Sequence, residues 1–192
     1  MTYLIIKIMS NKLEGKRIAI LAENGFEQSE LEKPKQALEE EGATTHVISS
    51  KSGKIKAWDE KDWGDKVAVD KTLDEVSAAD YDALLLPGGV MNPDKLRANA
   101  TAVSFVKAFL TAGKPVAAIC HGPWTLIETG LLAGKTMTSY ASIQTDLKNA
   151  GVNWVDQEVV VDSNLITSRK PDDIPAFNKQ IIESFALTAT TA

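Results

Sequence analysis

The chain has 192 residues, of which 44% are hydrophobic and 24% charged, a composition typical of a globular domain with a sizeable core. Its formal net charge of −5 disfavours non-specific binding to nucleic acid. No run of about 18 apolar residues predicts a membrane span. The single cysteine excludes an intramolecular disulfide and fits a reducing compartment, so we expect a cytoplasmic protein. We expect one domain over residues 15–187, between a poorly ordered N-terminal extension (1–14) and a C-terminal tail (188–192).

Strands and helices alternate along the predicted domain. Buried strands are predicted where short apolar runs end in turn residues, and helices where apolar residues recur at helical spacing. The strands are expected at 17–21, 45–49, 82–87, 116–119 and 136–139, the helices at 29–42, 101–112, 121–130, 143–150 and 172–186, and β-hairpins at 53–70 and 158–168. This order predicts an α/β fold in which a mostly parallel sheet has helices on both faces, with a small β-hairpin excursion.

Three loops leave the carboxyl ends of predicted strands, where α/β folds bind ligands. They carry Glu27, the pair Gly88-Gly89 and the pair Cys120-His121, and we expect them to converge. Cys120 lies between a strand and a helix, a junction that exposes a nucleophile above a sheet. A lone cysteine is more often a small buried hydrophobe. This position nevertheless favours a nucleophile whose pKa the helix dipole lowers below about 8.5.

The residues near Cys120 suggest roles around its sulfur. His121 can supply a base and a backbone N–H, whereas His46, inside a predicted strand, is expected to be structural. The Glu27 carboxyl either approaches the sulfur as a proton donor or general base, or simply opens the following helix. Gly88-Gly89 forms a plain tight turn or lets backbone N–H groups approach an oxyanion. The sequence has no phosphate-binding glycine motif and no Cys/His cluster, so we expect no metal or cofactor.

Four segments between about residues 16 and 186 carry a family resemblance. They are Glu-Asn-Gly-Phe-Glu27-Gln-Ser-Glu-Leu, Leu-Leu-Leu-Pro-Gly88-Gly89, Ala-Ala-Ile-Cys120-His121-Gly-Pro and Thr-Ser-Arg169-Lys-Pro-Asp-Asp. In order and spacing the chain resembles the ThiJ/PfpI family, and most closely its PfpI-type members in the class I glutamine amidotransferase-like superfamily. A glutamine amidotransferase itself is disfavoured, because no histidine follows His121 to complete the usual triad.

The resemblance implies a flavodoxin-like three-layer sandwich and assigns roles to several residues. Cys120 would be the nucleophile, Glu27 the acid held against its sulfur, and His121 the triad histidine. In PfpI-type members a third acid comes from a neighbouring subunit, and the matching position here is Asp94. If Asp94 completes a neighbour's site, the protein is a homo-oligomer, either a dimer or a hexamer.

The resemblance also implies a function for the expected site. We favour a stress-protective enzyme that acts on 2-oxoaldehydes, or on glycation adducts of proteins or nucleotides, and releases a 2-hydroxy acid. In this scheme a hemithioacetal forms on Cys120, and Glu27 shuttles a proton between adjacent carbons. Two alternatives stay open: an intracellular cysteine peptidase, and a redox-sensing or chaperone-like stress protein without turnover. We expect no membrane partner and no sequence-specific binding of nucleic acid.

Overall fold

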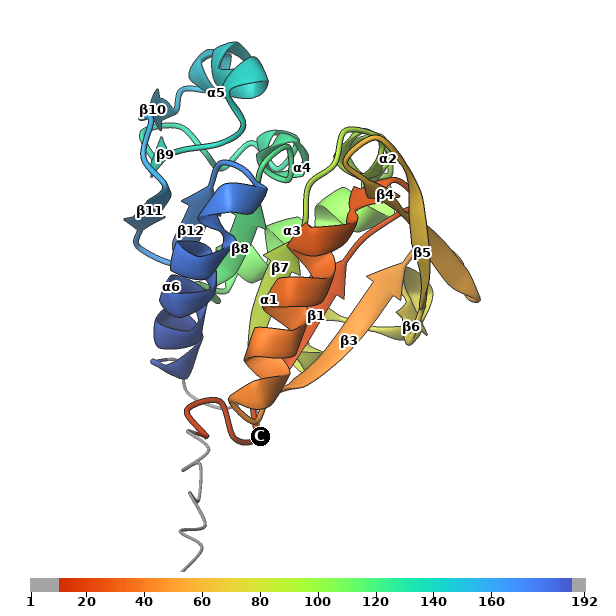
Figure 1. The fold of residues 1–192 in the computed structure, drawn as a ribbon. Helices are drawn as coiled ribbons and strands as arrows, with labels where there is room; N and C mark the ends of the chain where they lie inside the picture. The colour runs from red at the N-terminus through yellow and green to blue at the C-terminus, as the bar shows by residue number, and fades with distance from the viewer. Residues whose placement is uncertain (1–10, 188–192) are drawn as a thin grey trace, which may run out of the picture.

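A computed structural model describes residues 11–187, which form a three-layer α/β sandwich (Figure 1). The predicted tail and residues 1–10 of the predicted extension lie outside the described residues. The last part of that extension is packed into the domain. Leu13 is fully buried, and its backbone N–H donates to the carbonyl oxygen of Glu41 at 2.9 Å. The prediction of a poorly ordered extension is therefore wrong at Leu13.

The middle layer is a sheet of seven strands in the order β11-β12-β8-β7-β1-β3-β6. All of its pairings are parallel except that of β11 with β12, which confirms the predicted sheet. Along β1, Ile18 packs into one core cluster and Ala19 into the other, so the strand is buried on both faces. The strands are β1 (Arg17–Leu21), β3 (Thr44–Ser49), β6 (Lys71–Thr72), β7 (Ala83–Leu86), β8 (Val116–Ile119), β11 (Val159–Asp162) and β12 (Leu165–Ser168).

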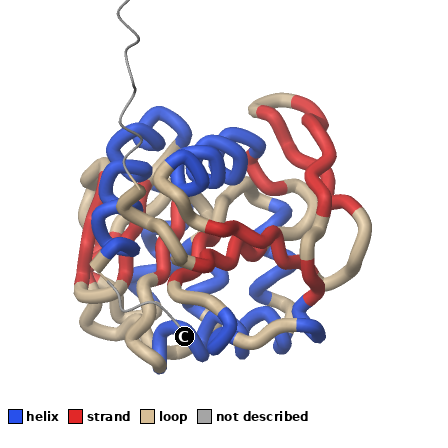
Figure 2. The backbone as a smooth tube through the Cα atoms, turned by 90° about the horizontal axis from the view of Figure 1, so that it is seen from below, coloured by secondary structure: helices blue, strands red, loops and turns tan. Residues whose placement is uncertain are grey.

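Helices cover both faces of this sheet (Figure 2). The pair α1 and α6 packs on one face, and α2, α3, α4 and α5 contribute to the core on the other. Short 3-10 helices join several of the longer elements. The helices are α1 (Gln28–Glu40), α2 (Met91–Arg97), α3 (Ala100–Thr111), α4 (Pro123–Ile127), α5 (Gln144–Asn149), α6 (Ile174–Ala186), η1 (Leu73–Glu75), η2 (Ala78–Asp80), η3 (Ala141–Ile143) and η4 (Pro171–Asp173).

Two small sheets lie outside the central one. The first contains the predicted hairpin, in which β4 (Lys54–Asp59) and β5 (Asp62–Ala68) pair antiparallel, and adds β2 (Phe26–Glu27) parallel to β4. The second pairs β9 (Thr136–Met137) with β10 (Asn153–Trp154). Because β2 belongs to the loop that leaves β1, the hairpin sheet reaches the carboxyl end of the central sheet, where the predicted site lies.

Two helices differ from the prediction. The segment Met91–Arg97, where no helix was predicted, forms α2. Proline is tolerated in the first turn of a helix, and Asn92, Pro93 and Leu96 are buried. Helix α1 begins at Gln28, one residue before its predicted start. Within residues 11–187, no helix combines the length and the apolar character needed to cross a membrane.

Candidate active site

Cys120 occupies a sharp turn between β8 and α4. Its φ of 62° lies in the left-handed region, which non-glycine residues rarely adopt. Hydrogen bonds hold the turn from both sides: the Cys120 N–H donates to the Ser168 carbonyl at 3.1 Å, and its carbonyl accepts from the Tyr140 N–H at 2.9 Å. Such a strained strand-to-helix turn is the geometry expected of a presented nucleophile.

The acid beside the Cys120 thiol is Glu30, not Glu27. Glu30 is fully buried in the first turn of α1, and its Oε2 accepts a hydrogen bond from the Gly88 N–H at 2.9 Å. The other carboxyl oxygen, Oε1, is buried and has no hydrogen-bond partner among the described nitrogen and oxygen atoms. An unsatisfied buried oxygen next to a thiol points to a role in chemistry rather than in folding alone.

The prediction that Glu27 is held against the sulfur is wrong for a geometric reason. Glu27 ends β2 and precedes the first residue of α1, where its Oε1 accepts from the Glu60 N–H of the hairpin at 3.4 Å. Glu30 is one helical turn further and belongs to the buried side of α1, together with Pro34 and Leu38. The i, i+4, i+8 spacing of Glu30, Pro34 and Leu38 was the signal that sequence reasoning missed.

Burial dominates the electrostatics of the acid and the thiol. It raises the pKa of Glu30 from 4.5 to about 8. Burial, with the negative charge of Glu30 second, also raises the pKa of Cys120 well above its ordinary value. The prediction of a lowered thiol pKa is therefore wrong, because α4 has only five residues and its dipole does not outweigh desolvation. At neutral pH Glu30 keeps its proton and is uncharged. In this state it does not oppose ionisation of the thiol.

The turn brings His121 into contact with the preceding residue. Its Nδ1 lies 3.2 Å from Cys120 Sγ, and its Nε2 lies 3.1 Å from Ser142 Oγ. Burial lowers the pKa of His121, so the imidazole is neutral at neutral pH. His121 is thus positioned as a base for the thiol proton. His46, by contrast, lies in β3, where its Nδ1 is 2.9 Å from the Tyr81 hydroxyl, as expected of a structural residue.

The two glycines after β7 have separate places in the site. The Gly88 N–H is occupied by Glu30, so it is not free to stabilise an oxyanion as predicted. The backbone N–H groups of Gly89 and His121 are directed at Cys120 and lower the pKa of its thiol, although less than burial raises it. A role of the Gly89 N–H in binding an oxyanion stays a prediction. The backbone N–H of His121 is the second donor available for that role.

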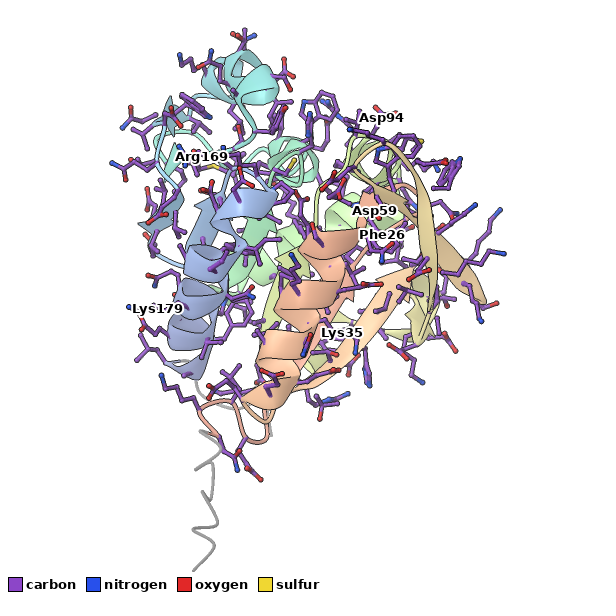
Figure 3. All side chains as sticks on the ribbon, viewed as in Figure 1. Phe26, Lys35, Asp59, Asp94, Arg169 and Lys179 are labelled. Atoms are coloured by element: carbon purple, nitrogen blue, oxygen red, sulfur yellow. The ribbon has the colours of Figure 1, made fainter. Side chains whose placement is uncertain are left out.

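Asp94 lies outside the cluster formed by Cys120, His121 and Glu30 in one chain. It is exposed on α2, near the same end of the molecule as Arg169 (Figure 3). Its predicted contribution to a neighbour's site stays a prediction. Among residues 11–187, no group of three or more His, Cys, Asp or Glu side chains is arranged to hold a metal ion.

Two cavities adjoin the segment that follows β12. One, of about 270 Å³, has Arg169 in its wall. Arg169 donates to Asp156 at 2.8 Å and to both carboxyl oxygens of Asp173 at 2.8 and 3.0 Å, so its guanidinium is fixed in place. The other cavity, of about 350 Å³, is bordered by Glu27 and has mostly acidic walls. The residues that line the 270 Å³ cavity beside Arg169 are Ser139, Tyr140, Ala141, Asp156, Arg169 and Lys170.

Comparison with known proteins identifies the family of this chain. A model of the DJ-1/PfpI family matches residues 16–184. The chain belongs to this family. General stress protein 18 of Bacillus subtilis is 49% identical over 175 residues, which are 90% of this chain and 98% of the relative. Protein/nucleic acid deglycase 2 of Escherichia coli is 44% identical over 170 residues, which are 88% and 96% of the two chains. The Drosophila melanogaster DJ-1beta crystal structure has a TM-score of 0.81 at 30% identity and covers 89% of this chain and 90% of its own.

These similarities confirm the predicted family and the predicted α/β sandwich. The DJ-1/PfpI fold of this chain places a carboxyl group, a thiol and an imidazole in a region that excludes water. Each group titrates differently in the folded and unfolded chain, which makes stability depend on pH.

The raised pKa of Glu30 predicts that this DJ-1/PfpI chain loses stability between pH 5 and pH 8. Folding favours the protonated carboxyl, so the contribution is complete below pH 4.5 and disappears as pH rises through about 8. We expect a loss of about 3 kcal/mol over this range. His121 acts in the opposite direction, since its lowered pKa costs stability as pH falls. Urea unfolding of the wild type and of Glu30→Gln at pH 5 and at pH 8 separates the contribution of Glu30 from that of His121. Equal pH dependence in both proteins would contradict the prediction.

Proposed function

We propose that this protein is a cysteine-dependent enzyme that acts on reactive 2-oxoaldehydes, or on the early glycation adducts they form, and releases a 2-hydroxy acid. The observation that carries the proposal is the Glu30 carboxyl buried against the Cys120 thiol. With a pKa of about 8, Glu30 has a proton to donate at neutral pH and becomes a base once that proton is transferred. The relatives named as a stress protein and a deglycase support this proposal.

The first step joins the substrate to the sulfur. Cys120 Sγ attacks the aldehyde carbon, and the thiol proton passes to the neutral His121 Nδ1, 3.2 Å away. A carbon–sulfur bond forms while the carbonyl π electrons move to oxygen, which takes the proton of Glu30. The backbone N–H groups of Gly89 and His121 stabilise the developing negative charge on that oxygen. The product is a hemithioacetal.

The second step moves a hydrogen between two adjacent carbons. Glu30, now ionised, removes the proton from the former aldehyde carbon, while protonated His121 gives its proton to the oxygen of the neighbouring carbonyl, and an enediol forms. Glu30 then delivers its proton to the neighbouring carbon and takes up the hydroxyl proton of the former aldehyde oxygen. The hemithioacetal becomes the thioester of a 2-hydroxy acid without an external oxidant, because one carbon is oxidised and its neighbour reduced. Attack of water then breaks the carbon–sulfur bond, releases the acid and returns Cys120, His121 and Glu30 to their starting protonation states. With a glycation adduct, the sulfur displaces the amine before the same steps follow.

The two other functions suggested by the sequence fit this site less well. Cys120 is only 6% exposed, which suits a small carbonyl compound better than the backbone of a polypeptide substrate. A redox sensor reacts through a stabilised and accessible thiolate, whereas burial raises the pKa of Cys120. Release of peptides from casein, or rapid oxidation of Cys120 to a sulfinic acid, would favour the respective alternative.

Replacing Cys120 with serine is expected to abolish turnover of methylglyoxal, with a loss of at least about 100-fold. A hydroxyl is far less nucleophilic than a thiol and forms no thioester. The assay follows methylglyoxal consumption and identifies lactate by NMR, with wild type and Cys120→Ser measured side by side and no glutathione added. Lactate from wild type alone would support the proposal. Equal rates from both proteins, or none from either, would contradict it.

A further inference from the structure

We infer that Ser142 is a positioning residue for His121: its hydroxyl accepts a hydrogen bond from the Nε2–H of the imidazole and so leaves Nδ1 unprotonated toward the Cys120 sulfur. This inference rests on the proposed role of Cys120 as nucleophile, but not on the identity of the substrate. Ser142 belongs to η3, and it contributes the third side chain of the arrangement from within the same chain.

Two distances connect the side chains of Cys120, His121 and Ser142. Sγ of Cys120 lies 3.2 Å from Nδ1 of His121, and Nε2 of the same ring lies 3.1 Å from Oγ of Ser142. The Glu30 carboxyl is also buried against the thiol. The imidazole therefore bridges the nucleophile and the serine hydroxyl through its two nitrogens.

Aromatic rings fix the plane of the imidazole. The Tyr140 ring stacks on it with a centroid distance of 4.8 Å and an interplanar angle of 25°. Trp124 meets it at an angle of 62° and a centroid distance of 5.5 Å, and the Trp124 indole N–H is itself held by Asp146 at 2.7 Å. With the ring plane set, its two nitrogens keep their directions toward the sulfur and Ser142.

The backbone ties Ser142 to the nucleophile turn. The Tyr140 N–H donates to the Cys120 carbonyl at 2.9 Å, and the Ile143 N–H donates to the Tyr140 carbonyl at 3.2 Å. These bonds connect the start of η3 to the residue whose side chain reacts. Ser142, two residues after Tyr140, is thus placed by the same turn that strains Cys120.

The direction of the hydrogen bonds follows from the groups at the two ends. A neutral imidazole carries one N–H, and the partner of one nitrogen decides which nitrogen is the acceptor. On the sulfur side, a protonated Glu30 donates to Sγ, and the thiol proton is directed at Nδ1. The remaining N–H is then on Nε2, where the Ser142 hydroxyl accepts it. All donors point the same way along Glu30, Cys120, His121 and Ser142, which strengthens each bond of the chain.

The test reads the tautomer of His121 directly. The chain has only two histidines, so long-range ¹H–¹⁵N NMR resolves His121 with His46 as an internal reference. We expect the wild type to show Nε2–H at His121 and Ser142→Ala to show a mixture of both tautomers. The conservative Ser142→Thr is expected to restore the wild-type spectrum. Ser52→Ala, at an exposed serine in the turn before β4, serves as the matched control.

A second readout uses the single cysteine. Its alkylation by iodoacetamide at neutral pH is expected to be roughly 3- to 10-fold slower in Ser142→Ala, close to wild type in Ser142→Thr, and unchanged in Ser52→Ala. An Nδ1–H tautomer in the wild type would overturn the inference, and so would an unaltered tautomer and alkylation rate in Ser142→Ala. A tautomer change in Asp94→Asn but not in Ser142→Ala would assign the role to a partner's acid instead. Because neither readout involves the aldehyde, failure to form lactate would reject the proposed function alone.

Discussion

Replacement of Glu30 with glutamine is expected to lower the rate of methylglyoxal conversion by about 100- to 10,000-fold. Glutamine has nearly the same shape, and its amide oxygen can still accept the Gly88 N–H, so the fold is retained. The amide neither donates an acidic proton to the aldehyde oxygen nor removes a proton from carbon. Both proton transfers of the proposed reaction are therefore lost, while Cys120 and His121 are unchanged.

Glu27→Gln provides the matched control for this experiment. Both residues are glutamates at the start of α1, three positions apart, but only Glu30 is buried against the thiol. We expect Glu27→Gln to retain most of the wild-type kcat, since this side chain accepts a hydrogen bond from the hairpin at Glu60. Measured kcat values for the two variants decide between the carboxyls. Loss of turnover in Glu27→Gln with full activity in Glu30→Gln would return the proton shuttle to Glu27.

Replacement of Gly89 with alanine is expected to destabilise the protein strongly and to disrupt the site. The φ of Gly89 is +75°, and an added Cβ would collide with the Gly25 carbonyl oxygen and lie 2.7 Å from the Glu27 backbone nitrogen. Both contacts are with backbone atoms, which cannot rotate away. We expect the left-handed backbone to lower the free energy of unfolding by about 1 to 2 kcal/mol. Overpacking is expected to lower it by about 1 to 3 kcal/mol more.

Gly113→Ala separates these two contributions. Gly113 has a φ of +70°, close to that of Gly89, but an added Cβ there would meet no heavy atom within 4 Å. Its loss of stability should reflect the backbone conformation alone. Urea unfolding gives the two free energies, and methylglyoxal turnover shows whether the site is damaged. Equal destabilisation by the two variants would contradict the close packing of Gly89 against the loop after β1.

The sequence was sufficient to predict most of the path of the chain and the place of Cys120 at a strand-to-helix turn. Short apolar runs predict the buried strands. Cys120 directly follows one such run and precedes a helical pattern, which predicts a strand-to-helix turn at this residue. The order of strands and helices also placed three loops at one edge, where Gly88, Cys120 and the start of α1 do meet. These features depend on residues near one another in the sequence, which is why local patterns reveal them.

The identity of the acid beside Cys120 and the pKa of its thiol could not be predicted from local patterns. Glu27 and Glu30 both follow β1, and the choice between them depends on where α1 begins and which side of it is buried. The pKa of Cys120 depends on how much water the folded chain excludes from the sulfur, a property to which many distant residues contribute. The link from His121 to Ser142 joins residues 21 positions apart through a 3-10 helix that the sequence pattern does not mark.

The left-handed backbone of Cys120 has a consequence for how such a chain changes over generations. A glycine at this position would relieve the strain, and an apolar residue in place of Glu30 would remove a buried ionisable group. Either change would remove a side chain of the proposed reactive centre. A duplicated copy of the gene that is no longer selected for catalysis can therefore lose the strained cysteine and the buried acid and keep the same fold. The strained cysteine and the buried acid persist together only where the chemistry is needed.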